Sequence, residues 1–76
     1  MEFNYAEFKK DMQREGHRVT KHGDYITVEP NNNAHGYSKG FGSAWDFIPE
    51  QYYRQLKFVN MDHFNNIIYK AKFKIM

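Results

Sequence analysis

HRVTKHGDYITVEP, residues 17–30, is the stretch that decides the fold, because its apolar and polar side chains alternate with the period of two typical of a β-strand. Gly23 accepts a positive φ without steric cost, so we expect His22 and Gly23 to form a two-residue turn between two strands. This pairing sets Val19 opposite Ile26 on one face. The stretch therefore predicts a β-hairpin with one apolar and one polar face.

The residues before the hairpin predict an amphipathic helix over about residues 5–15. Asn4 is a good N-cap, and Glu7, three residues later, completes a capping box. Gly16 is a natural left-handed stop at the other end. The apolar side chains of this segment recur on one helical face: Tyr5, Phe8 and Met12. We expect this face to cover the apolar side of the hairpin.

A Gly-rich segment follows the hairpin at residues 30–49 and reads PNNNAHGYSKGFGSAWDFIP. It is too long for an ordinary connection, leaves room for a third short strand, and has too many aromatic side chains for a disordered linker. Those aromatic side chains must be buried in the fold or bind a partner. The contact residues expected in the 34–45 loop are Tyr37, Lys39, Phe41 and Trp45.

The C-terminal part predicts two further helices. Pro49 suits the first position of a helix over residues 49–57, because its missing N–H is not needed there. Asn60 is an expected N-cap for a helix over residues 61–74, in which apolar residues follow a helical stripe. An alternative remains for residues 69–76, which alternate apolar and Lys as a strand would; we favour helix at least to Lys72. The fold class is thus α+β, in one domain over residues 1–76.

Composition limits the possible chemistry. The chain of 76 residues has no Cys, which excludes disulfides, thiolate chemistry and Cys-based metal sites. No apolar run approaches the roughly 20 residues of a membrane span, and no signal-peptide core follows Met1. We therefore expect a cytoplasmic protein with no membrane contact and no cofactor.

The charge is unevenly placed along the chain. The net charge is +2, but residues 31–76 carry six Lys/Arg against three Asp/Glu. Lys70, Lys72 and Lys74 stand close together with no acid beside them. They fit either a phosphate-facing patch or cations that complement the end of a helix.

From Tyr25 onward, the order of parts resembles the Cys-His-Cys-Cys zinc-ribbon domain of DNA primases and its phage and plasmid relatives. The segments that carry the resemblance are ITVEP, GYSKGFGSAWDFI and LKFVNMDHFNNIIYKAKF. Gly36 and Lys39 stand where knuckle cysteines would be, and only His35 remains near a ligand position. The resemblance implies a metal-free ribbon, followed by two helices, that contacts single-stranded or template DNA.

Four histidines raise the alternative of catalysis. Small RNA-cleaving toxins also combine a helix with a hairpin and use one strand His, so His22 or His35 is a candidate catalytic base. No His pair has the i, i+4 spacing of a helical zinc site, and no nucleophile arrangement is identifiable. The sequence therefore predicts no catalytic and no metal-binding residue.

The predicted function is non-enzymatic binding. Small size and abundant residues with AT-rich codons fit a phage or mobile-element gene, whose product would inhibit or modulate a host protein through the 34–45 loop. The alternative is a nucleic-acid-binding module that uses the same loop with Lys70, Lys72 and Lys74. The sequence leaves homodimer formation open.

Overall fold

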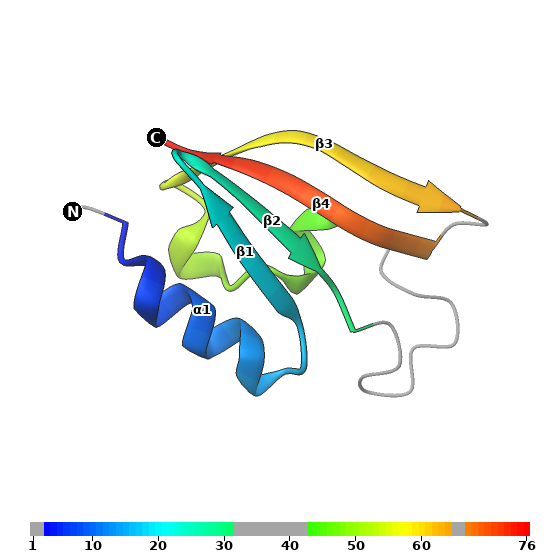
Figure 1. Ribbon diagram of the computed structural model, residues 1–76, viewed down its shortest axis with the longest axis horizontal. Helices are drawn as coiled ribbons and strands as arrows, with labels where there is room; N and C mark the ends of the chain where they lie inside the picture. The colour runs from blue at the N-terminus through cyan, green and yellow to red at the C-terminus, as the bar shows by residue number, and fades with distance from the viewer. Residues whose placement is uncertain (1–2, 32–42, 65–66) are drawn as a thin grey trace.

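The computed structural model describes residues 3–31, 43–64 and 67–76. One helix precedes a four-stranded antiparallel sheet with the strand order β1-β2-β4-β3 (Figure 1). The fold class α+β is therefore confirmed. The elements are α1 (Tyr5–Arg14), β1 (Arg18–His22), β2 (Tyr25–Glu29), the 3-10 helices η2 (Ala44–Phe47) and η3 (Glu50–Tyr52), β3 (Leu56–Phe64) and β4 (Ile67–Ile75).

Helix α1 forms as its local signals predict. The Asn4 side chain accepts a hydrogen bond from the Glu7 backbone N–H at 3.1 Å, which satisfies one of the free donors of the first turn. Gly16 follows the helix with a φ of +84°, the conformation that favours glycine. Phe8 and Met12 are fully buried against the sheet. The predicted helix and its core-facing stripe are confirmed, but only half of the predicted capping box forms, because the Glu7 side chain does not accept a hydrogen bond from the Asn4 backbone N–H.

The hairpin forms, but the predicted register is wrong by two residues. The turn residues are Gly23 and Asp24, so His22 pairs with Tyr25 and Val19 pairs with Val28 instead of Ile26. Gly23 still supplies the positive φ, +61°, but as the first turn residue rather than the second. A shift by two residues keeps every side chain on its predicted face.

The prediction of two C-terminal helices is wrong. Residues 49–53 hold only a short 3-10 turn, and β3 and β4 pair as two long antiparallel strands. The alternative reading of residues 69–76 as extended is the one that the structure shows. One register shift accounts for part of the helical appearance: Tyr69 is an extra residue in β4, so the buried Ile68 and Ala71 stand three residues apart, as on a helix. Val59 is a second extra residue, in β3, and lies between the two predicted helices.

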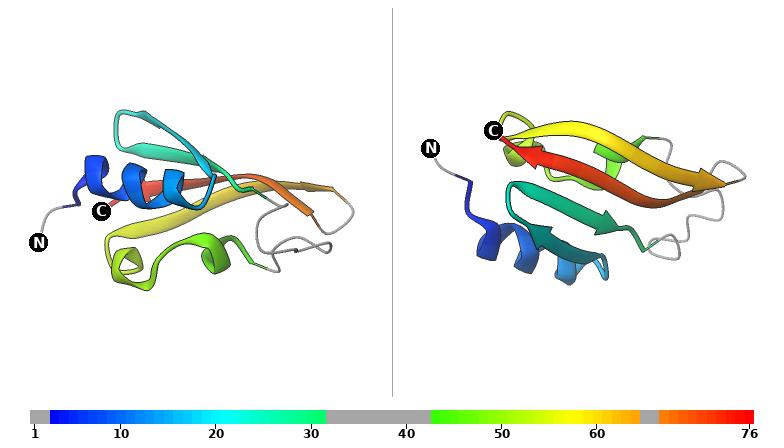
Figure 2. Two further views of the ribbon diagram at one scale, coloured as in Figure 1. Left: turned by 90° about the horizontal axis from the view of Figure 1, so that it is seen from below. Right: turned by 45° about the horizontal axis from the view of Figure 1, so that its top comes forward.

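The 3-10 helices cover the second half of the sheet. Ser43 caps η2 through a capping box with Asp46, and Pro49 precedes η3. Figure 2 shows α1 and both 3-10 helices on the same side of the sheet, α1 against β1 and β2 and the others against β3 and β4. The core lies between these layers and contains Phe8, Met12, Val19, Ile26, Val28, Ala44, Phe47, Ile48, Tyr52, Leu56, Ile68, Ala71 and Phe73. The opposite face of the sheet is left bare by the described residues.

No helix in the described part of the chain has the length and apolar character needed to cross a membrane.

Candidate nucleic-acid interface

The candidate site is the sheet face that no described element covers, hereafter the lysine face, and β4 supplies its centre. Ala71 and Phe73 are fully buried in the core. Because side chains alternate along a strand, the residues between and beside them point to the opposite side. These residues are Lys70, Lys72 and Lys74. The strand assignment thus aligns three ammonium groups in a row on one surface.

Strand β2 adds an aromatic ring beside the lysines. Tyr25 pairs with Lys74, and Thr27 pairs with Lys72, which places both on the lysine face. Tyr25 is 39% exposed, and the Lys72 Nζ lies 4.9 Å from the centroid of its ring. Such a cation–π contact is worth about 0.5–1 kcal/mol at an exposed site and fixes the ring and the ammonium group relative to each other.

Strand β3 completes the lysine face on the other side of β4. Lys57 lies directly opposite Lys74, Asn60 lies opposite Lys72, and Asp62 lies opposite Lys70. Like charges in directly opposed positions destabilise a sheet. The Lys57–Lys74 pair therefore costs stability and concentrates positive charge at one end of the face.

The β4 lysines are not neutralised within the described structure. None of the three forms an ion pair with a residue in ranges 3–31, 43–64 or 67–76. Asp62 and, across β2, Glu29 are the acids at the edge of this face. Lys70 and Lys74 are exposed, whereas Lys72 is half-buried with its Nζ over the Tyr25 ring. Lysines without an ion-pair partner attract anionic groups such as phosphates.

The predicted contact residues do not all meet at one place. Trp45 is half-buried on the covered side, where its ring lies 5.0 Å from that of Phe73 and 5.2 Å from that of Tyr53. The sheet therefore separates Trp45 from the lysines of β4. Three further predicted residues lie outside the described residues: Tyr37, Lys39 and Phe41.

Two residues of the lysine face were not among the predicted contacts. Tyr25 already belongs to the polar side of the hairpin in the sequence pattern, and its exposure there was the available signal. Nothing in the sequence indicated that Lys57 belongs to the site, because residues 49–57 were predicted to form a helix. Its position opposite Lys74 follows only from the strand pairing.

The described histidines do not come together in a metal-binding group. No group of three or more His, Cys, Asp or Glu side chains within the described ranges could hold a metal ion. His17 is buried, and its Nδ1 accepts a hydrogen bond from the Asn31 backbone N–H at 2.8 Å. His22 and His63 are exposed, and the candidate His35 lies outside the described residues.

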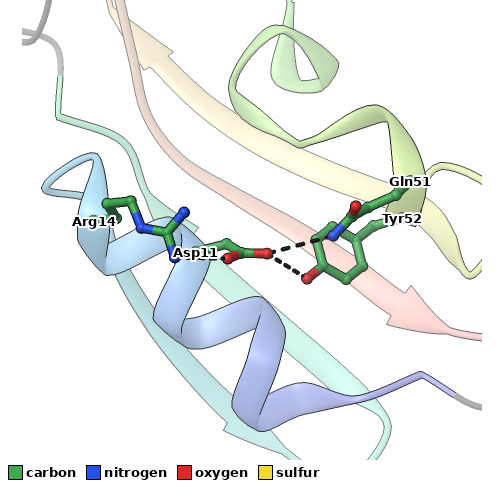
Figure 3. Close-up of polar contacts among 4 residues, drawn as sticks. All are labelled: Asp11, Arg14, Gln51 and Tyr52. Carbon is green, nitrogen blue, oxygen red and sulfur yellow. Dashed lines mark hydrogen bonds and ion pairs between the residues drawn. The ribbon is translucent and has the colours of Figure 1, made fainter.

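A polar cluster on the covered side joins α1 to η3 and stabilises the fold (Figure 3). The Tyr52 hydroxyl donates a hydrogen bond of 2.7 Å to Asp11 Oδ2, and Gln51 Nε2 donates one of 3.4 Å to the same oxygen. Arg14 lies 3.5 Å from the other carboxylate oxygen. Burial, and then the hydrogen bond to Asp11, raises the pKa of Tyr52 to about 12. With its carboxylate occupied by three neighbours, Asp11 acts as a link between two elements.

Comparison with protein-family models, with curated proteins and with solved structures found no match to this chain. The two terminal helices implied by the primase zinc-ribbon resemblance are absent from the described structure, since β3 and β4 occupy that part of the chain.

Proposed function

We propose that the protein binds single-stranded nucleic acid on the lysine face. The observation that carries the proposal is the row of Lys70, Lys72 and Lys74 on a sheet face that no described element covers, next to the exposed ring of Tyr25. Ammonium groups meet phosphates without regard to sequence, and an aromatic ring stacks on any base. This combination suits a single strand, whose bases are free to stack, better than a duplex, whose bases are paired.

The interpretation as a modulator of a host protein stays a prediction. Its contact segment was the 34–45 loop, of which the structure describes residues 43–45 only. Trp45, the aromatic residue among them, packs against Phe73 in the covered layer. The lysine face therefore supports nucleic-acid binding more directly than the described part of the loop supports a protein contact.

The test is fluorescence anisotropy with a labelled oligothymidylate of about 12 nucleotides, a length within the site sizes of single-strand binders. Three phosphate contacts give a log–log salt slope of about −2, so the affinity should fall roughly 20-fold between about 50 and 200 mM salt. A duplex of the same length should bind more weakly. Absence of binding at both salt concentrations would overturn the proposal and leave the host-protein modulator as the working hypothesis.

A matched pair of triple variants assigns the binding to one face. Lys70→Gln/Lys72→Gln/Lys74→Gln should remove most of the salt dependence. The control, Lys9→Gln/Lys10→Gln/Lys21→Gln, removes the same charge from α1 and the covered side of β1. It should bind nearly as the parent protein does. An equal loss of affinity in the two variants would show that the net charge of the protein, rather than the lysine face, binds the oligonucleotide.

A further inference from the structure

The sheet has two edges, and they differ in how they are protected. Strand β1 has five residues, lies against α1 and carries Arg18 and Lys21. Strand β3 has nine residues and pairs, among the described residues, with β4 alone. A strand of that length whose outer edge pairs with no described strand presents a row of backbone N–H and C=O groups to a further strand. The β3 edge is therefore the more available of the two.

Exposed apolar side chains lie along the β3 edge. Phe58 is 38% exposed and Val59 is 41% exposed, although both belong to a strand of the main sheet. On the covered side, Phe58 and Met61 line an open depression of about 200 Å³ together with Trp45. A neighbouring strand that brings its own apolar side chains to this side would fill the depression and cover Phe58.

The bulge at Val59 gives β3 an unusual symmetry. Leu56 is buried and Phe58 packs on Phe73, so Lys57 points to the lysine face and Phe58 to the covered side. After the extra residue, Met61 returns to the covered side and Asp62 to the lysine face. Residues at equal distances from the midpoint between Val59 and Asn60 therefore point to the same face: Phe58 and Met61 to the covered side, Lys57 and Asp62 to the lysine face.

We propose that two copies of this chain pair antiparallel through β3, about a two-fold axis between Val59 and Asn60. This register sets Lys57 opposite Asp62 of the second copy on the lysine face. It also sets Phe58 opposite Met61 of the second copy on the covered side. The strand is therefore self-complementary in both charge and apolarity, as a two-fold interface requires. A strand without a bulge could not adopt this register. The two members of each pair, such as Lys57 and Asp62, are an odd number of residues apart, and in a regular strand such residues point to opposite faces.

A bulge ordinarily discourages further pairing at an edge, because it breaks the ladder of hydrogen bonds. A second copy carries the same bulge at the same place, so the two irregularities meet on the axis and the ladder resumes on either side. The product is a continuous sheet of eight strands with both lysine faces on one side. This pairing does not depend on the proposed nucleic-acid function, since it rests on β3 alone.

The test is sedimentation equilibrium of the parent protein without nucleic acid, over a dilution series that spans the micromolar range. A single-edge interface is small, so we expect a dimer that dissociates on dilution within that range. A monomer at the highest concentration would overturn the proposal.

Charge reversal tests the register. Lys57→Glu and Asp62→Lys should each weaken dimerisation at least about tenfold, because each sets like charges opposite across the axis. The double variant Lys57→Glu/Asp62→Lys should restore the dimer. All three changes are on exposed positions, and circular dichroism checks that the variants fold. A dimer that none of them affects, or that the double variant fails to restore, would contradict the β3 interface.

Discussion

The two faces of the sheet use the same strands for different purposes. On the covered face, Ile26, Val28 and Phe73 are completely buried beneath α1 and the 3-10 helices. On the lysine face, Lys72 and Lys74 alternate along β4 with the buried Ala71 and Phe73. Neighbouring residues of one strand thus contribute to stability on one side and to the proposed binding on the other. Substitutions on β4 should therefore separate the two properties.

The largest expected effect is on the covered face. Phe73→Ala removes a fully buried ring that contacts the rings of Trp45 and Phe58. The free energy of unfolding should fall by about 3–5 kcal/mol, which is most of the stability of so small a domain. Urea unfolding followed by circular dichroism measures it. The adjacent Lys74→Gln is the control, and a loss below about 1 kcal/mol at Phe73 would refute the assignment of this face as the core.

A smaller effect is expected where the covering elements are joined. Tyr52→Phe removes the hydrogen bond to Asp11 and should cost about 1–2 kcal/mol. The pKa of Tyr52 is raised from 10.0 to about 12 in the folded protein, so folding favours the neutral phenol. Its contribution is complete below about pH 10 and is lost as the pH rises toward 12.

Urea unfolding across this alkaline range checks the linkage. The difference in unfolding free energy between the parent protein and Tyr52→Phe should shrink as the pH rises. Tyr53→Phe is the control, because Tyr53 is 41% exposed and its hydroxyl donates a hydrogen bond to the Trp45 carbonyl and not to Asp11. A difference that stayed constant to pH 12 would contradict the claim that the hydrogen bond from Tyr52 to Asp11 stabilises the fold.

The cap of α1 should contribute less again. Asn4→Ala leaves the Glu7 backbone N–H without its side-chain acceptor and should lower the free energy of unfolding by about 1 kcal/mol. Asn4→Asp keeps an acceptor and should retain the parent stability. The measurement is the midpoint of thermal unfolding of the parent protein and the two variants. Equal midpoints would show that the Asn4 cap does not stabilise α1.

The smallest effect on stability is expected on the lysine face. Lys70→Gln/Lys72→Gln/Lys74→Gln should change the free energy of unfolding by no more than about 0.5 kcal/mol, because the side chains are not in the core. Relief of the repulsion between Lys74 and Lys57 offsets the lost Lys72–Tyr25 contact. A large destabilisation in urea would show that the two faces are not separable.

The parts of the fold that sequence predicts well are those with local signals. Asn4, Glu7 and Gly16 mark both ends of α1 within a few residues of chain, and Gly23 locates the hairpin turn to within one residue. The register of that hairpin could not be fixed, because neighbouring choices keep the same side chains inside.

The C-terminal strands show why the rest could not be predicted. The extra residue Tyr69 places the buried Ile68 and Ala71 at helical spacing, although the segment is extended. Three lysines of the candidate site were identified from charge alone. These lysines share a face with Tyr25 and Lys57 because of the strand pairing. That pairing could not be predicted from a sequence pattern interrupted by two bulges.

The central claim, that the lysine face binds single-stranded nucleic acid, is tested most directly by nuclear magnetic resonance of the isotope-labelled protein titrated with oligothymidylate. We expect the backbone amide signals of β2 and β4 around Tyr25, Lys72 and Lys74 to shift, and those of α1 to stay unchanged. Shifts confined to α1 or to the depression beside Trp45, or no shift at all, would contradict the account.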